Sequence, residues 1–167
     1  GAGRKSQIEY SYSEVNESIN AYSLDGHRHL PEISQELGRL DESFRSKITF
    51  LPHLVPMTRG LLASCYAPVK RSALGSDLRT AVMDVYTDFY RDEPFVCIGN
   101  NPPATKHTVG SNFCVLYPTV DLRTDRLIVI SCIDNLVKGA AGQAVQNMNL
   151  MLGYTEDEGL KQLASYP

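Results

Sequence analysis

Apolar side chains return every three or four residues in three parts of the chain, the spacing that places them on one face of a helix. Pro31 suits a first helical position, Ser76 can cap a helix, and Gly153 is a typical residue after a last turn. The pattern therefore predicts three helices, over residues 31–40, 76–91 and 138–152.

Between these helices, short runs rich in branched and aromatic residues indicate strands. The predicted strands cover residues 47–51, 60–69, 95–98, 112–120 and 126–133, with a polar turn at 121–125. The first two are expected to belong to one sheet. Connections of hairpin or helical length favour an α+β fold: a mixed, largely antiparallel sheet with helices on one face, and the other face free to meet a second subunit.

Length and charge narrow the class of protein. The 167 residues predict a single domain, 1–167, and a net charge of −3 gives no electrostatic footprint for nucleic acid. The longest apolar run, near residues 127–133, is too short to span a bilayer, and no signal peptide opens the chain. We therefore expect a cytoplasmic protein with neither nucleic acid nor membrane as a partner.

The four cysteines are widely spaced and form no C-x-x-C pair: Cys65, Cys97, Cys114 and Cys132. Each lies within an apolar run that is predicted to form a strand. Buried cysteine behaves as a small hydrophobic residue, so all four are expected to be buried and structural.

Small residues and uncharged polar side chains crowd the start of the third predicted helix, over residues 134–149. Glycine and alanine steps allow another backbone, or a flat cofactor, to approach the helix N-terminus, where free N–H groups favour acceptor atoms. Close packing of this helix on a sheet would account for the same composition. The residues alone leave the two explanations open.

A second segment combines His27, Arg28, His29 and Glu32 around the start of the first predicted helix. The two histidines are two positions apart, so in an extended segment they lie on the same side. Imidazole is the side chain whose charge changes near neutral pH, which makes the segment a candidate for acid/base chemistry. The alternatives are solvated loop histidines, or a zinc site for which no third strong ligand is evident.

Four segments, in order along the chain, resemble N-acetyl-γ-glutamyl-phosphate reductase, specifically its substrate-binding and dimerisation half. They are residues 1–5, residues 20–33 with the two histidines, residues 53–60, and the Gly/Ala-rich stretch 134–149. The resemblance covers the chain nearly end to end. It implies the C-terminal architecture of glyceraldehyde-3-phosphate dehydrogenase-like proteins, which agrees with the α+β pattern.

The resemblance implies an activity. The chain is expected to be part of an NADPH-dependent reductase that converts N-acetyl-glutamyl 5-phosphate to N-acetyl-glutamate 5-semialdehyde in arginine biosynthesis, through a cysteine thioester. In the family, the nucleophilic cysteine and the Rossmann half precede the segment that matches Gly1, so both are expected to lie outside this chain. No G-x-G-x-x-G turn occurs in it, and we expect the fragment alone to bind NADP poorly.

The resemblance also gives individual residues expected roles. His27 is the expected catalytic acid/base, and substrate contacts are expected for Arg4, Tyr22, His29, Glu32 and Arg59. Cofactor contacts are expected for Asn135, Lys138 and Gly139, and no metal is expected. Guanidinium groups suit an acyl phosphate and a carboxylate, although Arg4 or Arg59 could equally be a surface residue.

The expected partners are a small-molecule substrate and further copies of the chain, in a homodimer or a dimer of dimers. Two alternative functions stand beside the reductase. Aspartate-semialdehyde dehydrogenase shares the architecture and a similar Gly/Ala helix, but His27 and His29 followed by Pro31 and Glu32 favour the glutamyl-phosphate enzyme. A non-catalytic oligomerisation module would keep the fold without its chemistry.

Overall fold

The computed structural model describes residues 7–44, 47–73 and 75–166. They form two compact units, Gly1–Met57 and Thr58–Pro167, and each is described by itself. No helix among the described residues is long and apolar enough to cross a membrane.

The N-terminal unit is built from short elements. In chain order these are the 3-10 turn Ile8–Tyr10, α1 (Tyr12–Val15), β1 (Asn20–Ala21), α2 (Leu30–Leu40), the 3-10 turn Glu42–Phe44 and β2 (His53–Leu54). The helix predicted over residues 31–40 is confirmed as α2, with Pro31 in its first turn. β1 and β2 pair antiparallel as a two-stranded sheet.

The strand predicted over residues 47–51 is wrong. That segment forms no strand, and pairing begins only after Pro52, whose carbonyl accepts the N–H of Tyr22. The resulting strand, β2, pairs with β1 and does not join the sheet that contains residues 60–69. Alternating apolar residues indicate an extended backbone, but they do not show whether a partner strand lies beside it.

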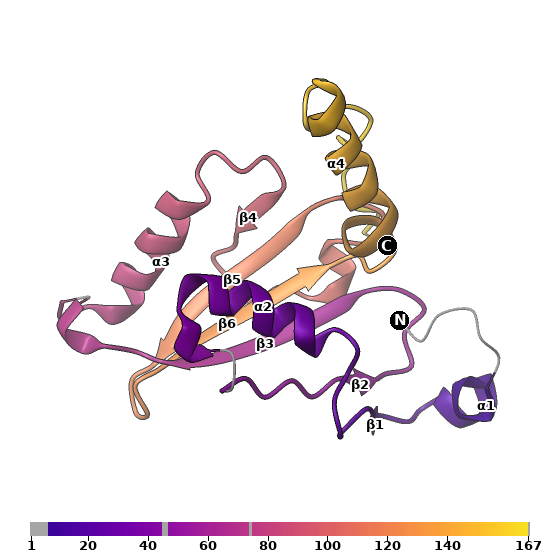
Figure 1. The fold of residues 1–167 in the computed structure, drawn as a ribbon, viewed down its shortest axis with the longest axis horizontal. Coiled ribbons are helices and arrows are strands. Elements are labelled where there is room, and N and C mark those ends of the chain that lie inside the picture. Colours follow the sequence, from indigo (N-terminus) through magenta and orange to yellow (C-terminus); the bar gives the residue numbers. More distant parts are fainter. Residues whose placement is uncertain (1–6, 45–46, 74, 167) are drawn as a thin grey trace. The chain divides into compact units, whose positions relative to one another are not determined.

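The C-terminal unit contains the main sheet (Figure 1). Its elements are β3 (Leu61–Pro68), α3 (Leu78–Phe89), β4 (Val96–Ile98), β5 (Cys114–Asp121), β6 (Arg126–Ile133) and α4 (Gly142–Leu152), with short 3-10 turns at Arg71–Ala73 and Thr105–His107. The strand order is β3-β6-β5-β4, antiparallel except for the β4–β5 pair. The four strands predicted here and the mixed, largely antiparallel α+β sheet are confirmed.

The helix α3 covers one face of this sheet near the β5–β6 turn. Leu78 and Val82 on α3 pack with Val120 on β5, and Leu127, which pairs with Val120, lies against the same cluster. Asp77 caps α3 by accepting the N–H of Thr80 at 3.3 Å, so the cap lies one residue after the predicted Ser76. This cluster forms the aliphatic core of the unit.

Only one of the four cysteines is buried as expected. Cys65 and Cys97 are exposed, Cys114 is half-buried, and Cys132 is buried. The exposed pair lie on β3 and β4, the two edge strands of the sheet, whereas the other two lie on the central strands. Position in the sheet, which the sequence does not show, therefore decides their burial.

The predicted Gly/Ala-rich helix is confirmed, but its first turn is a π-helix over Val137–Ala141 that continues into α4. Gly153 ends α4 with φ 75°, the left-handed conformation that glycine adopts without strain. In Figure 1, α4 projects from the end of the sheet away from α3. The junction between β6 and this π-turn is where the candidate site of the unit lies.

Candidate functional site

The candidate residues fall into two clusters, one in each compact unit. Tyr22, His27, His29 and Glu32 belong to the N-terminal unit, and the four others that the structure describes, Arg59, Asn135, Lys138 and Gly139, belong to the C-terminal unit. Arg4 lies outside the described residues.

In the N-terminal unit, two of the predicted residues lie around the ring of a third, His27. Its centroid is 5.6 Å from that of Tyr22, 4.7 Å from His29 and 5.4 Å from Phe50, each with an edge-to-face orientation. Phe50 was not predicted to belong here; it comes from the segment that was expected to be a strand. Glu32 lies exposed in the first turn of α2.

The hydrogen bonding of His27 determines its tautomer. The backbone N–H of His29 donates to Nδ1 of His27 at 3.1 Å, so Nδ1 is an acceptor and the neutral ring carries its proton on Nε2. Desolvation lowers the pKa of His27, and the nearby charges of His29 and Arg28 lower it further. The ring is therefore neutral at physiological pH and offers Nε2–H as a donor.

The zinc alternative gains no support from the arrangement. Within the part of the chain that the structure describes, no group of three or more His, Cys, Asp or Glu side chains could hold a metal ion. Three such ligands with suitable geometry are the usual minimum for a catalytic zinc site.

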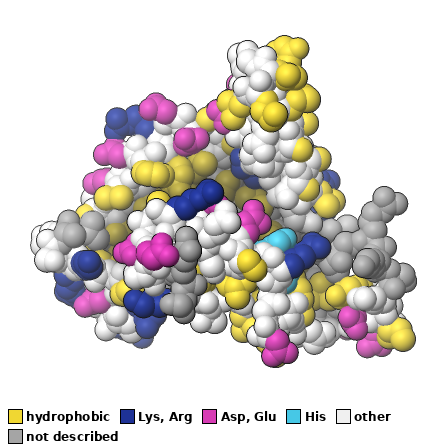
Figure 2. Space-filling view, in the orientation of Figure 1, with side chains coloured by type: hydrophobic (Ala, Val, Ile, Leu, Met, Phe, Trp, Pro, Cys, Tyr) yellow, Lys and Arg dark blue, Asp and Glu magenta, His cyan; other side chains and the backbone are white. Residues whose placement is uncertain are grey.

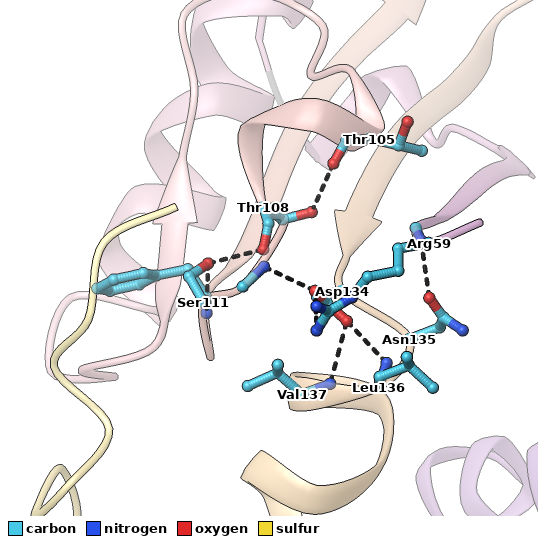
Figure 3. Close-up of polar contacts among 11 residues, drawn as sticks. Arg59, Thr105, Thr108, Ser111, Asp134, Asn135, Leu136 and Val137 are labelled. Carbon is cyan, nitrogen blue, oxygen red and sulfur yellow. Dashed lines mark hydrogen bonds and ion pairs between the residues drawn. The ribbon is translucent and has the colours of Figure 1, made fainter. Parts of the chain in front are cut away.

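In the C-terminal unit, the site is organised by Asp134, which follows β6 directly and is fully buried (Figure 3). One carboxylate oxygen accepts the N–H groups of Leu136 at 2.8 Å and Val137 at 3.1 Å. The other accepts the N–H of Gly110 at 2.7 Å and pairs with the guanidinium of Arg59 at 2.9 Å. The carboxylate thus has four donors, which is close to its full capacity.

These donors keep Asp134 charged. Burial alone would raise the pKa of Asp134, but the N–H groups of Gly110, Leu136 and Val137, together with the charge of Arg59, lower the pKa below its ordinary value. A charged carboxylate in this position therefore holds three separate chain segments at one point.

Asn135 adds a second link between the two segments that Asp134 and Arg59 join. Its Oδ1 accepts the N–H of Gly60 at 2.7 Å, so the group that Asn135 can offer to a ligand is its NH2. Gly60 has φ 113°, and an added Cβ would lie 2.7 Å from that of Thr105, so only glycine fits. The contact fixes which way the amide of Asn135 points.

The two other predicted cofactor contacts differ in position. Lys138 directs its ammonium to Oε1 of Gln146 at 2.7 Å and lies 5.4 Å above the ring of Phe95, and burial lowers its pKa. Gly139 is exposed in the π-turn. The N–H of Gly139 donates to the carbonyl of Asp134 at 3.0 Å, so Gly139 offers a ligand close approach and no free donor, while the Lys138 side chain is engaged with neighbours inside the unit.

Sequence reasoning missed Asp134 as a site residue, together with the buried amides Asn112 and Gln146, which hydrogen-bond each other at 2.9 Å. A signal for Asp134 exists in the sequence: an acidic residue directly after an apolar strand needs a partner if it is buried. Its partners lie 75 and 24 positions away along the chain, at Arg59 and Gly110, and local patterns do not reveal them.

Comparison with known proteins gives consistent results. Residues 1–135 match the family model described as semialdehyde dehydrogenase, dimerisation domain. Over the whole chain, the sequence is 52% identical to N-acetyl-gamma-glutamyl-phosphate reductase from Dehalococcoides mccartyi (strain 195), 51% identical to that from Geobacter metallireducens, and 48% identical to that from Geobacillus stearothermophilus. The chain spans 48% of the length of each of these relatives.

The fold also has a solved counterpart. The structure is similar to a crystal structure of aspartate semialdehyde dehydrogenase II from Vibrio cholerae, with a TM-score of 0.57. The match covers 80% of this chain and 41% of that chain at 15% sequence identity, so it concerns the fold alone. The glyceraldehyde-3-phosphate dehydrogenase-like architecture expected from the sequence is confirmed.

Proposed function

We propose that this chain is the substrate-binding and dimerisation half of an N-acetyl-γ-glutamyl-phosphate reductase. The chain belongs to the semialdehyde dehydrogenase dimerisation-domain family. The observation that carries the proposal is the identity of about half of all positions to reductases from three genera over the whole chain. The whole enzyme would reduce N-acetyl-glutamyl 5-phosphate to N-acetyl-glutamate 5-semialdehyde in arginine biosynthesis.

The proposed reaction proceeds through a thioester on a cysteine supplied by the remainder of the polypeptide. The thiolate attacks the acyl phosphate and phosphate leaves; reduction of the thioester then gives a thiohemiacetal, which releases the aldehyde and regenerates the thiolate. NADPH would supply the hydride. In this chain, the NH2 group of Asn135 suits its carboxamide and Gly139, which has no side chain, would allow the ring to approach, whereas the Lys138 ammonium is already engaged with Gln146.

His27 fits an acid/base role at the substrate oxygen. When the thioester is reduced, negative charge develops on that oxygen, and the Nε2–H of the neutral ring can donate a hydrogen bond to it. The proton that completes the hydroxyl of the thiohemiacetal would come from the imidazolium form, which the lowered pKa makes a stronger acid. The hydrogen bond from the His29 backbone holds the ring in the donating tautomer. His29, Tyr22 and Glu32, which lie within ten positions of one another, would contact the substrate together with Arg4.

Arg59 would bind the phosphate or the carboxylate of the substrate. Its side chain keeps 36% of its surface exposed while one nitrogen pairs with Asp134. Guanidinium groups bind such oxyanions with paired hydrogen bonds, so a guanidinium anchored at one edge is well suited to the task.

The sheet face opposite α3 is the proposed dimer surface. Ala67 pairs with Leu127, which packs against the α3 cluster, so its neighbour Tyr66 points to the other face, as does Leu62. These two side chains are 62% and 49% exposed. Isologous pairing of this face would bury them, in a homodimer or within a dimer of dimers.

Dimerisation is tested by sedimentation at micromolar concentration. The 167-residue chain should sediment as a dimer, and Tyr66→Asp should convert it to a monomer because the charge would be buried at the interface. Tyr12→Asp, at a comparably exposed position of the N-terminal unit, should leave the dimer intact. A parent chain that is strictly monomeric would contradict the assignment.

The catalytic proposal is tested with the full-length polypeptide that contains this chain, run in the oxidative direction with NADP and phosphate. N-acetyl-glutamate 5-semialdehyde should be oxidised far faster than aspartate semialdehyde, and the 167-residue chain alone should be inactive with either. Preference for aspartate semialdehyde would favour the alternative dehydrogenase. Absence of activity with both, in a folded full-length protein, would favour an oligomerisation module without chemistry.

A further inference from the structure

The hydrogen bonds and the ion pair around Asp134 hold more of the chain in place than contact with a ligand alone would require. Asp134 joins the segment before β3, the loop at Gly110 and the start of the π-turn, through Arg59, Gly110 and the pair Leu136 and Val137 (Figure 3). These segments carry the two side chains proposed to meet different ligands, Arg59 for the substrate and Asn135 for the cofactor. Asp134 itself is fully buried and has no surface for either.

The loop that carries Gly110 is itself held in place. The hydroxyl of Thr108 donates to the carbonyl of Thr105 at 3.1 Å, and the hydroxyl of Ser111 donates to the carbonyl of Thr108 at 2.9 Å. Thr108 and Ser111 are fully buried. The N–H of Gly110 is thus presented to Asp134 from a fixed loop, so the carboxylate is located independently of Arg59.

Stability alone does not explain a charge at this point. Burial of an ion pair costs desolvation free energy that its Coulomb attraction only balances, and well-packed apolar residues are often as stabilising. A carboxylate, unlike an apolar side chain, makes directional contacts, and each oxygen of Asp134 fixes two donors in place. Arg59 Nε is buried without a hydrogen-bond partner among the described residues, so the orientation of this guanidinium depends on its Nη2 contact with Asp134.

We infer that Asp134 is a positioning residue, which sets the Arg59 guanidinium and the Asn135–Gly139 turn in one fixed relation. The inference rests on the proposed function for what the two groups bind. The second contact between the same segments, from Gly60 N–H to Asn135 Oδ1, lies beside the Arg59–Asp134 pair and maintains the same relation. Loss of Asp134 should therefore disturb substrate and cofactor binding together, although it touches neither.

The test uses Asp134→Asn in the full-length enzyme, because the amide keeps the shape but cannot accept all four donors. We expect the KM for the acyl substrate to rise about tenfold or more and the KM for NADP to rise severalfold, with a smaller change in kcat. Asp125→Asn is the matched control, since Asp125 pairs with Arg71 in an exposed ion pair, and both KM values should stay within twofold.

A double variant separates positioning from bulk destabilisation. Arg59→Met should raise the substrate KM, and adding Asp134→Asn to it should raise that KM little further, because the group that Asp134 orients is already absent. A lower Tm with unchanged KM values in Asp134→Asn would show a purely structural role and overturn the inference. Should Asp134→Asn not fold, the inference predicts that Arg59→Met alone raises the substrate KM and leaves the NADP KM within twofold, because Gly110, Leu136 and Val137 still hold the carboxylate; an equal rise in both KM values would overturn it.

A second readout needs no enzymatic activity, so it separates this inference from the proposed function. In the 167-residue chain, the buried Arg59 Nε–H should give an NMR resonance that exchanges slowly with water. Asp134→Asn should speed this exchange at least tenfold, whereas Asp125→Asn should not. Unchanged exchange in Asp134→Asn would contradict the inference even in an active enzyme, and a full-length protein without reductase activity would contradict only the proposed function.

Discussion

The two ends of the β5–β6 hairpin are buried by opposite kinds of chemistry. Near its turn, Leu78 and Val82 of α3 cover Val120, and the contacts are aliphatic. At the open end, Phe95 and Cys132 are buried together with a group of fully or nearly fully buried polar side chains: Thr108, Ser111, Asn112, Asp134, Gln146 and Asn149. One sheet therefore supports an aliphatic core at one end and a core rich in hydrogen bonds at the other.

The difference shows what each end contributes. Aliphatic burial stabilises without direction, at roughly 25 cal/mol per Å² of apolar surface. Buried polar groups stabilise little on balance, but they fix the direction of each neighbour and cost free energy when a partner is lost. The polar end is where Arg59, Asn135 and Gly139 lie, which are the groups of this unit that the proposed function requires in fixed positions.

The two helices repeat the contrast. α3 buries Leu78 and Val82, whereas α4 buries Gly142, Gln146 and Asn149. The amide of Asn149 donates to the carbonyls of Glu156 and Glu158, and Met151 on the outer side is 85% exposed. Figure 2 shows hydrophobic side chains gathered on the projecting end of α4. α4 is thus held to its unit by amides, with its apolar side chains outward.

The largest expected loss of stability is at the apolar end. Leu78→Ala should lower the free energy of unfolding by about 2–5 kcal/mol, because a buried leucine is replaced by a cavity. Val85→Ala, on the exposed side of α3, should change it by less than about 0.5 kcal/mol. Urea unfolding followed by circular dichroism measures both, and equal effects would show that α3 does not form the core.

At the polar end, Gly142→Ala should cost about 1–3 kcal/mol. A Cβ there would lie 2.3 Å from Asn112 Oδ1 and 2.8 Å from the carbonyl oxygen of Val137, so the hydrogen-bonded core would have to move. Gly139→Ala is the control, since its methyl group would come closest to the flexible end of Ile133, at 3.3 Å, and would meet the carbonyl oxygen of Asp134 at an ordinary 3.5 Å. In an ordinary helix, Gly→Ala usually raises the free energy of unfolding. The same result for Gly142→Ala would show that the polar end is not closely packed around Gly142.

The polar end should also give the unit a specific acid sensitivity. Since the pKa of Asp134 is lowered in the folded state, its contribution to stability is present above the ordinary pKa of Asp, about 3.9, and is lost as the pH falls through the folded value. Unfolding titrations between pH 6 and pH 2 should show a shallower loss in Asp134→Asn than in the parent. Identical slopes would mean that Asp134 does not titrate with folding.

The smallest effect concerns the start of α3. Asp77→Ala should cost about 1 kcal/mol, because Asp77 accepts the N–H and the hydroxyl of Thr80, and these bonds lower the pKa of Asp77. Ser76→Ala should be nearly neutral. If Ser76→Ala lowered the Tm more than Asp77→Ala does, Ser76 would be the N-cap, as the sequence predicted.

Much of the fold could be predicted from local pattern. The periodicity of residues 31–40 and 76–91 is confirmed as α2 and α3, because helical spacing depends on near neighbours only. The 47–51 segment and the exposure of Cys65 and Cys97 were mispredicted, since both depend on which strand lies alongside. Strand order is a property of the whole unit.

The candidate site shows the same division. His27 and His29 lie close together as the sequence predicts, but a turn, in which the N–H of Leu30 donates to the carbonyl of His27, brings them together and not an extended segment. The contact of Tyr22 with His27 was not predictable from spacing. Asp134 binds groups from Arg59 and Gly110, and Lys138 turns towards Gln146 in a contact that depends on the π-turn. Only the folded arrangement brings these groups together.

The kcat of His27→Asn in the full-length enzyme, assayed with N-acetyl-glutamate 5-semialdehyde, tests the account most directly. We predict a fall of about 10² to 10⁴, the usual contribution of a placed acid/base, with Tm and cofactor affinity nearly unchanged. His53→Asn, at an exposed histidine of the same unit, should keep normal turnover, and His29→Asn should raise the KM more than it lowers kcat. Near-normal turnover in His27→Asn would contradict the assignment of the proton transfer to this ring.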